Sequence, residues 1–204
     1  MGLLSSTSNT DACAFLDEQH NEVDDLFATF EDSDAGDSGG RQIFEQIRDK
    51  LRAHAQIEEE IFYPPIKNAK AEATGEEIAE AVEEHYQIKL IIADIDQTRP
   101  RGDVFKGKMK VLKEDVEHHV GEERDTVFPD ARKYLGKERL EEVGNQLRAR
   151  AEELMKRGAR TAAKPARPRP RATSSRTRRT AARSKSASAS KSPARGKSRT
   201  KARR

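Results

Sequence analysis

The stretch His54-Ala55-Gln56-Ile57-Glu58-Glu59-Glu60-Ile61-Phe62-Tyr63-Pro64 has a counterpart later in the chain, His119-Val120-Gly121-Glu122-Glu123-Arg124-Asp125-Thr126-Val127-Phe128-Pro129. In each copy a histidine is followed four residues later by a glutamate and ten residues later by a proline. Side chains four residues apart lie on one face of an α-helix, with Cβ atoms roughly 6 Å apart. Each copy therefore predicts a helix on which an imidazole and a carboxylate lie together, able to bind one metal ion or to flank a pair.

Apolar residues recur at alternating spacings of three and four in four segments, which predicts helices that pack in a bundle. We expect these helices to run from a cap at Asn9 or Thr10 to about Phe30, from about Gln42 to Tyr63, from a capping box at Thr74-Gly75-Glu76-Glu77 through Ile95, and from Phe105 through Val127. Pro64-Pro65 ends or kinks the second helix and Pro129 disturbs the end of the fourth. A further amphipathic helix follows Gly136.

The predicted fold class is therefore all-α: an up-down-up-down four-helix bundle, a fifth helix beside it, and a disordered basic tail. We expect a flexible N-terminus over residues 1–9, the bundle over 10–135, the additional helix over 136–158 and the tail over 159–204. Nothing in the chain alternates like a strand, and about 125 residues are enough to bury a real core.

Each of the four apolar seams carries a histidine near its middle, and two also carry a glutamate one turn later. Unpaired carboxylates in an apolar interior cost several kcal/mol each, and a bound cation removes that cost. We therefore predict a metal site; a buried glutamate–histidine network without metal is the alternative. The candidate ligands are His20, His54, Glu58, His85, His119 and Glu123.

The fourth helix offers two overlapping His-x-x-x-Glu pairs, of which only one can face inward. His119 and Glu123 continue the seam of Leu112 and Val116, whereas His118 and Glu122 lie on a largely polar row. The histidine-to-proline spacing of ten, shared with the first copy, agrees with this choice. We expect His119 and Glu123 to be buried and His118 to flank the site.

Charge divides the chain into an acidic body and a basic end. Residues 159–204 hold 17 of the 39 lysines and arginines and none of the 36 acidic residues, which leaves 22 basic against 36 acidic residues in 1–158, a net charge of −14. The tail resembles the Lys/Ala/Ser/Pro tails of linker-histone-like proteins. It is expected to bind nucleic acid non-specifically by neutralising phosphates; the alternatives are a solubilising tail and one that folds back on the acidic body.

The order His20, His54-x-x-x-Glu58, His85, His119-x-x-x-Glu123 resembles the hemerythrin family, in its HHE cation-binding branch, over roughly residues 10–135. The resemblance implies a non-haem di-iron site bridged by the two carboxylates. Glu59 and Tyr86 are candidates for groups that orient the ligands. Oxygen-carrying hemerythrins have a second histidine where this chain has Lys89. This departure favours the HHE branch, whose members handle or sense oxygen, nitric oxide or peroxide. A ferritin-type site has the reverse order, Glu-x-x-His, and zinc usually takes only four ligands.

The sequence thus favours a metal-binding protein over a dedicated enzyme: an iron-containing sensor or handler of dioxygen, nitric oxide or peroxide, tethered to nucleic acid by its tail. The alternatives are an enzyme that consumes peroxide or nitric oxide and, less favoured, a nucleic-acid-packaging protein whose bundle is structural. No apolar run reaches the roughly 20 residues of a membrane span, and a single cysteine, Cys13, excludes an internal disulfide. We expect a cytoplasmic, nucleic-acid-associated protein with no membrane partner.

Overall fold

The computed structural model describes residues 11–33 and 38–162, and within these ranges the chain is helical with no strand. The predicted all-α class is therefore confirmed. The expected flexible N-terminus and nearly all of the expected basic tail lie outside the described residues. Within the described part of the chain, no helix is long and apolar enough to cross a membrane.

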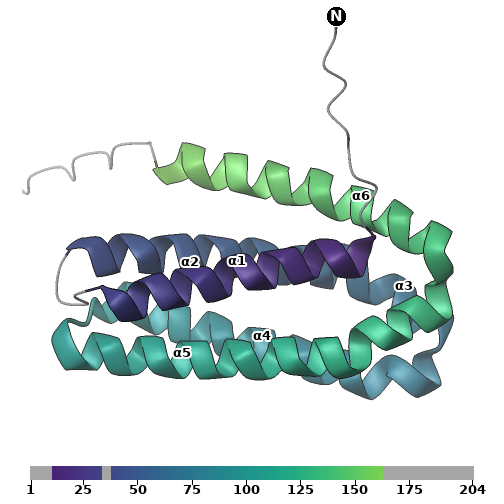
Figure 1. The fold of residues 1–204 in the computed structure, drawn as a ribbon, viewed down its shortest axis with the longest axis horizontal. Coiled ribbons are helices and arrows are strands. Elements are labelled where there is room, and N and C mark those ends of the chain that lie inside the picture. Colours follow the sequence, from purple (N-terminus) through teal and green to yellow (C-terminus); the bar gives the residue numbers. More distant parts are fainter. Residues whose placement is uncertain (1–10, 34–37, 163–204) are drawn as a thin grey trace, which may run out of the picture. The chain divides into compact units, whose positions relative to one another are not determined.

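Four long helices form the bundle, and a fifth packs beside it (Figure 1). The helices are α1 (Ala12–Asp32), α2 (Ser38–Ile57), α3 (Tyr63–Ala69), α4 (Ala71–Thr98), α5 (Gly102–Glu122) and α6 (Phe128–Ala162), with two π-helical turns, η1 (Glu58–Phe62) and η2 (Glu123–Val127). Helix α1 packs on α2, α4 packs on α5, and α6 packs on both α1 and α2. This is the arrangement expected of an up-down-up-down bundle with an added helix.

Neither of the two expected helix caps forms; α2 and α5 also begin earlier than expected, at Ser38 and Gly102. Helix α1 is capped by Asp11, whose carboxylate accepts a hydrogen bond from the Ala14 amide at 2.9 Å, in place of the expected Asn9 or Thr10. Helix α4 starts at Ala71, so Thr74 lies inside its first turn and donates to the Lys70 carbonyl at 3.0 Å. A threonine hydroxyl that bonds back to its own helix cannot cap it, which is why the expected capping box does not form.

Gly136 breaks α6 as expected, with φ 71° and ψ 171°. Only glycine adopts this backbone conformation without strain. The break lets the second half of α6 turn back so that its apolar face, with Leu140, Val143 and Leu147, is buried against the bundle. The predicted fifth helix is therefore present, and it continues to Ala162, a few residues beyond the predicted end at 158.

The core consists of two apolar clusters that share no residue, and the buried histidines and glutamates belong to neither. One cluster joins the α3 and α6 region to the start of α1, with Phe62 and Ile66 fully buried. The other contains Phe27, Phe44 and Phe105. Each fully buried aromatic or aliphatic side chain contributes about 1.5–3 kcal/mol to folding. Two such clusters hold the helices firmly enough to keep six polar side chains buried together.

Candidate metal centre

Both repeated motifs contain a π-helical turn that begins at the glutamate. The Tyr63 amide donates to the Glu58 carbonyl, and the Phe128 amide donates to the Glu123 carbonyl, so each bond closes over five residues instead of four. The proline that follows has no amide proton to continue the regular pattern. Single π-turns inside α-helices occur often at functional sites. Tyr63 and Phe128, five residues after the buried glutamates, are themselves buried.

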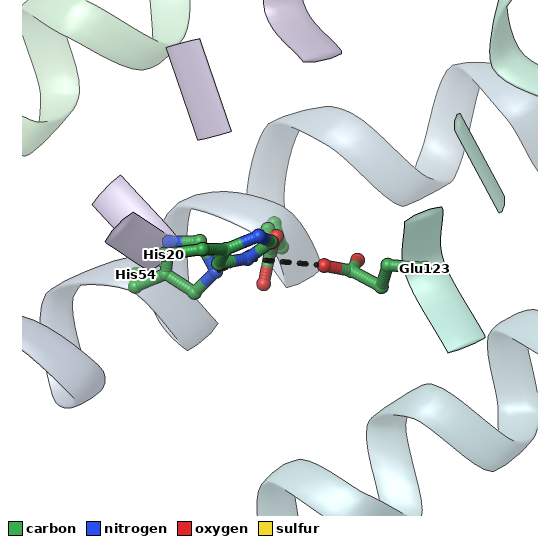
Figure 2. Close-up of side chains that lie close together, drawn as sticks. His20, His54 and Glu123 are labelled. Atoms are coloured by element: carbon green, nitrogen blue, oxygen red, sulfur yellow. Dashed lines mark hydrogen bonds and ion pairs between the residues drawn. The ribbon is translucent and has the colours of Figure 1, made fainter. Parts of the chain in front are cut away.

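The structure buries all six side chains that the sequence singled out, and Glu58 and Glu123 have no exposed surface. They come from α1, α2, η1, α4, α5 and η2, so the site is built by every long helix of the bundle. Figure 2 shows His20 and His54 facing the carboxylate of Glu123. The choice between the two overlapping pairs is also settled: the side chain of His119 is 3% exposed, whereas that of His118 is 65% exposed.

One half of the site lies between α1 and α2. Nε2 of His20 lies 2.8 Å from Nε2 of His54, which lies 3.0 Å from Oε1 of Glu58. Oε2 of Glu123 lies 3.3 Å from Nε2 of His20. These four residues bring one ligand-type atom each to within 4.8 Å of one another.

The other half of the site lies between α4 and α5. Nε2 of His85 lies 3.1 Å from Nε2 of His119 and 3.2 Å from Oε2 of Glu58. Oε2 of Glu123 lies 3.7 Å from Nε2 of His119. Each oxygen of Glu58 thus faces a different half of the site. Each half has two histidines, and Glu58 belongs to both.

Polar partners outside the site orient three of the histidines. Nδ1 of His54 lies 2.9 Å from Oε1 of Gln19, and Nδ1 of His119 lies 2.8 Å from Oε2 of Glu84. Nδ1 of His85 lies 3.0 Å from Oε1 of Glu59. Because these partners are acceptors, each Nδ1 atom donates, and in a neutral ring the inward Nε2 atom then presents a lone pair. Hydrogen-bonding partners of this kind are typical of metal-ligating histidines.

The inward atoms fit a bound cation better than they fit one another. Metal–ligand bonds of about 2.0–2.2 Å place adjacent ligand atoms roughly 2.8–3.6 Å apart around one ion, and nearly all the separations above fall in that range. The two histidine–histidine contacts are hydrogen bonds where one Nε2 of the pair carries a proton; where both nitrogens present lone pairs, they repel unless a positive charge lies between them. Both oxygens of Glu58, one of Glu123 and Nδ1 of His20 also lack a hydrogen-bond partner. Buried carboxylate oxygens left in this state are what a cation would satisfy.

The pKa values of the metal-free site indicate which of its groups carry protons when no cation is bound. Burial raises the pKa of Glu123 to about 7, and the nearby charge of Glu58 adds to this effect. Burial also opposes the charge of Glu58, but its contacts with His54 and His85 outweigh that and hold its pKa well below the usual range. The pKa of His85 is raised to about 9, because its contacts with two glutamates outweigh burial. Without a cation, the site takes up protons to balance its carboxylates.

A small apolar cavity lies against the four histidines. Its walls include Val23, Leu51, Ile88 and Val116. Its volume of about 20 Å³ exceeds the roughly 10–15 Å³ needed for one water-sized probe. The space accommodates a water molecule or a diatomic gas beside the histidine nitrogens. A larger organic molecule does not fit in the cavity as it stands.

Sequence reasoning missed three residues of the site and misplaced one. Gln19 and Glu84 directly precede His20 and His85, so their proximity was visible, but their contacts are with His54 and His119 on the neighbouring helices. Tyr63 donates its hydroxyl proton to Oε1 of Glu123 at 2.9 Å. Glu59 does orient a ligand-type histidine, as expected. Tyr86 is 54% exposed and takes no part.

The chain is similar to known proteins in sequence and in fold. Residues 11–131 match the family model described as the Hemerythrin HHE cation binding domain. The crystal structure of a Hemerythrin HHE cation binding domain-containing protein from Mycobacterium kansasii has a TM-score of 0.67 and 21% identity, covering 77% of this chain and 94% of that one. This likeness shows the same fold.

Two curated relatives are similar in sequence. A protein of Nostoc named DNA nickase is 28% identical over 138 residues, which make up 68% of this chain but only 38% of the Nostoc protein. An uncharacterised protein of Mycobacterium tuberculosis is 27% identical over 113 residues, or 55% of this chain and 67% of that protein. This chain therefore spans well under half the length of the Nostoc relative.

Proposed function

Because the chain belongs to the Hemerythrin HHE cation binding domain family, we propose that its six buried histidines and glutamates hold two iron ions. The observation that carries the proposal is the position of Glu58, whose two oxygens face His54 on one side and His85 on the other. A carboxylate in that position can bridge two ions, each with two histidines of its own. Imidazole and carboxylate ligands suit iron.

The proposed role is to sense or handle dioxygen, nitric oxide or peroxide. When bound, iron supplies the affinity for such ligands and the redox chemistry. The chain supplies a cavity of about 20 Å³ against the histidines, and its volume and apolar walls favour a small diatomic molecule. The paired apolar clusters keep bulk water away from the site.

A second candidate is a metalloenzyme that consumes peroxide or nitric oxide, and Tyr63 is the observation that favours it. Its hydroxyl holds a proton 2.9 Å from Glu123, and burial raises its pKa well above the usual value, so the proton is retained at neutral pH. Reduction of peroxide requires protons next to the metal. Turnover of peroxide by the iron-loaded protein that falls at least tenfold in Tyr63→Phe would support the enzyme; binding without turnover would support the sensor.

The basic tail is proposed to hold the protein on nucleic acid. Its 17 positive charges without a single acidic residue favour phosphate contacts that release counterions. The DNA-related name of the Nostoc relative is consistent with this role but comes from a protein of which this chain matches 38%. If the bundle were only structural, as in a packaging protein, loss of the buried histidines would leave binding to duplex DNA and every other property unchanged.

The tail proposal is tested by salt dependence. The full chain and a variant ending at residue 158 are compared for binding to duplex DNA at several salt concentrations. The full chain should bind with an affinity that falls steeply with salt, because each neutralised phosphate adds about 0.9 to the logarithmic slope. The shortened chain should show no measurable binding. Equal binding by the two chains would contradict the proposal.

The metal proposal is tested by loading the full chain with ferrous iron under anaerobic conditions and measuring the metal retained after desalting. The variant His54→Ala/His119→Ala removes one histidine from each half of the site and should retain no iron. Glu60→Gln is the matched control, because Glu60 lies beside Glu58 and Glu59 in sequence but pairs on the surface with Arg150. Equal iron in the double variant and the wild type would refute the proposal.

A further inference from the structure

A second histidine–carboxylate cluster lies on the surface, beside the buried centre. It consists of His118 and Glu122 of α5 and Glu84 of α4. Nε2 of His118 lies 3.3 Å from Oε1 of Glu84 and 3.3 Å from Oε1 of Glu122. The side chains of His118, Glu122 and Glu84 are 65%, 39% and 16% exposed, so each has some surface open to solvent.

The 3.3 Å spacing within the cluster fits ligands of one cation and is longer than that of a strong ion pair. Charge-assisted hydrogen bonds between nitrogen and a carboxylate are about 2.7–2.9 Å long, and one Nε2 proton cannot serve two carboxylates well. A separation of 3.3 Å lies inside the roughly 2.8–3.6 Å expected between ligands of one cation with bonds of about 2.0–2.2 Å. The pair His118 and Glu122 also repeats the four-residue spacing of both buried pairs.

The negative charge of the cluster is not neutralised by any lysine or arginine among the described residues. Within residues 11–33 and 38–162, the ion-pair partners of Glu84 and Glu122 are the histidines His118 and His119, and neither glutamate pairs with a lysine or arginine. Two carboxylates facing one exposed imidazole carry an excess of negative charge. Glu114 on the same helix, by contrast, pairs with Lys110.

Glu84 connects the surface cluster to the buried centre. Its Oε1 faces His118, while its Oε2 accepts from Nδ1 of His119 at 2.8 Å. The carboxylate therefore has one oxygen for each environment. A cation held on the surface would bind the same carboxylate that orients a buried histidine.

We propose that Glu84, His118 and Glu122 form a surface binding site for a divalent first-row metal cation, separate from the buried pair. Two carboxylates and one imidazole suit Mn²⁺, Fe²⁺ or Zn²⁺. Water fills the remaining coordination positions, so the cation exchanges readily. The site does not depend on occupation of the buried centre, because none of the six buried candidate ligands belongs to it.

The test uses Mn²⁺ as the probe and the full chain. Electron paramagnetic resonance of free Mn²⁺ gives the number of ions bound to the wild type, to His118→Ala and to Glu114→Gln. His118→Ala should lose one exchangeable binding equivalent or bind it at least tenfold more weakly. Glu114→Gln, an exposed carboxylate change on the same helix, should bind as the wild type does. Identical isotherms for His118→Ala and the wild type would show an ion pair only and overturn the proposal.

Proton nuclear magnetic resonance provides a measurement tied to the residue itself. The imidazole resonance of His118 is identified as the one missing in His118→Ala. In His54→Ala/His119→Ala, which lacks a histidine from each half of the buried centre, small amounts of Mn²⁺ should still broaden this resonance, and Glu84→Gln should reduce the broadening. A resonance that stays sharp would overturn the proposal. Failure of the buried centre to retain iron would leave this result unchanged, so the two proposals fail separately.

Discussion

Replacing Glu58 by glutamine removes the charge of a carboxylate whose two oxygens face different halves of the centre. Glutamine has nearly the same shape, and its amide can accept from His85 and donate to His54, the two histidines that Glu58 contacts at 3.2 and 3.0 Å. We expect the metal-free variant to fold, with a free energy of unfolding within about 2 kcal/mol of the wild type, because the neutral amide keeps polar contacts with both histidines. Its response to metal should differ sharply.

The magnitude follows from linkage. An ion present at 100 times its dissociation constant stabilises the folded protein by about 2.7 kcal/mol. For a domain of this size that raises the melting temperature by about 5–10 °C per ion. If the loss of a shared charged ligand weakens each ion at least 100-fold, the stabilisation falls to about 0.4 kcal/mol at the same concentration. The shift then nearly disappears for both ions, because Glu58 serves both.

The assay is thermal unfolding of the full chain with and without ferrous iron under anaerobic conditions. Glu60→Gln is the control, because it makes the same change in the same turn, where the side chain pairs with Arg150. The control should keep the full metal-induced shift. An undiminished shift in Glu58→Gln would refute the reasoning that this carboxylate joins two metal ions.

Three further results are expected. Gln19→Leu removes the acceptor that orients His54 and should weaken iron binding about 10–100-fold without removing a ligand; unchanged affinity in a competition titration would contradict this. Between pH 6 and 8, iron affinity should rise with pH, because the ion displaces protons from His85 and Glu123, whose pKa values are raised to about 9 and about 7 in the metal-free protein; proton release measured on binding checks the sign, and proton uptake would contradict it. Gly136→Ala should lower the free energy of unfolding by about 1–3 kcal/mol in urea titration, because the residue has φ 71° and ψ 171°; a neutral effect would mean that the chain bends elsewhere.

Periodicity predicted the fold and the inward residues because both depend on spacing along a single helix. The seam through Leu112 and Val116 separated His119 from His118 correctly, since a helix that buries one face leaves the neighbouring row exposed. The apolar face of the fifth helix was equally visible, with Leu140 and Leu147 buried as expected. Whether the six buried residues ligate metal stays a prediction.

Contacts between side chains on different helices could not be predicted from the sequence. Gln19 and Glu84 orient histidines on partner helices, and that depends on how α1 lies against α2 and α4 against α5. The two π-helical turns were also not predicted, although the proline ten residues after each histidine was a signal for them in the sequence. An added residue in one turn changes which side chains face inward, and this is how Tyr63 comes to contact Glu123. The start of α4 was misread because Thr74 bonds back to the helix instead of capping it.

The most direct measurement of the central claim is the number of iron atoms per chain in the full-length protein after anaerobic loading and desalting. The two groups of ligand-type atoms that share Glu58 predict about two iron atoms per chain in the wild type and none in His54→Ala/His119→Ala. No retained iron in the wild type, or the same amount in the double variant, would contradict a di-iron centre at these residues.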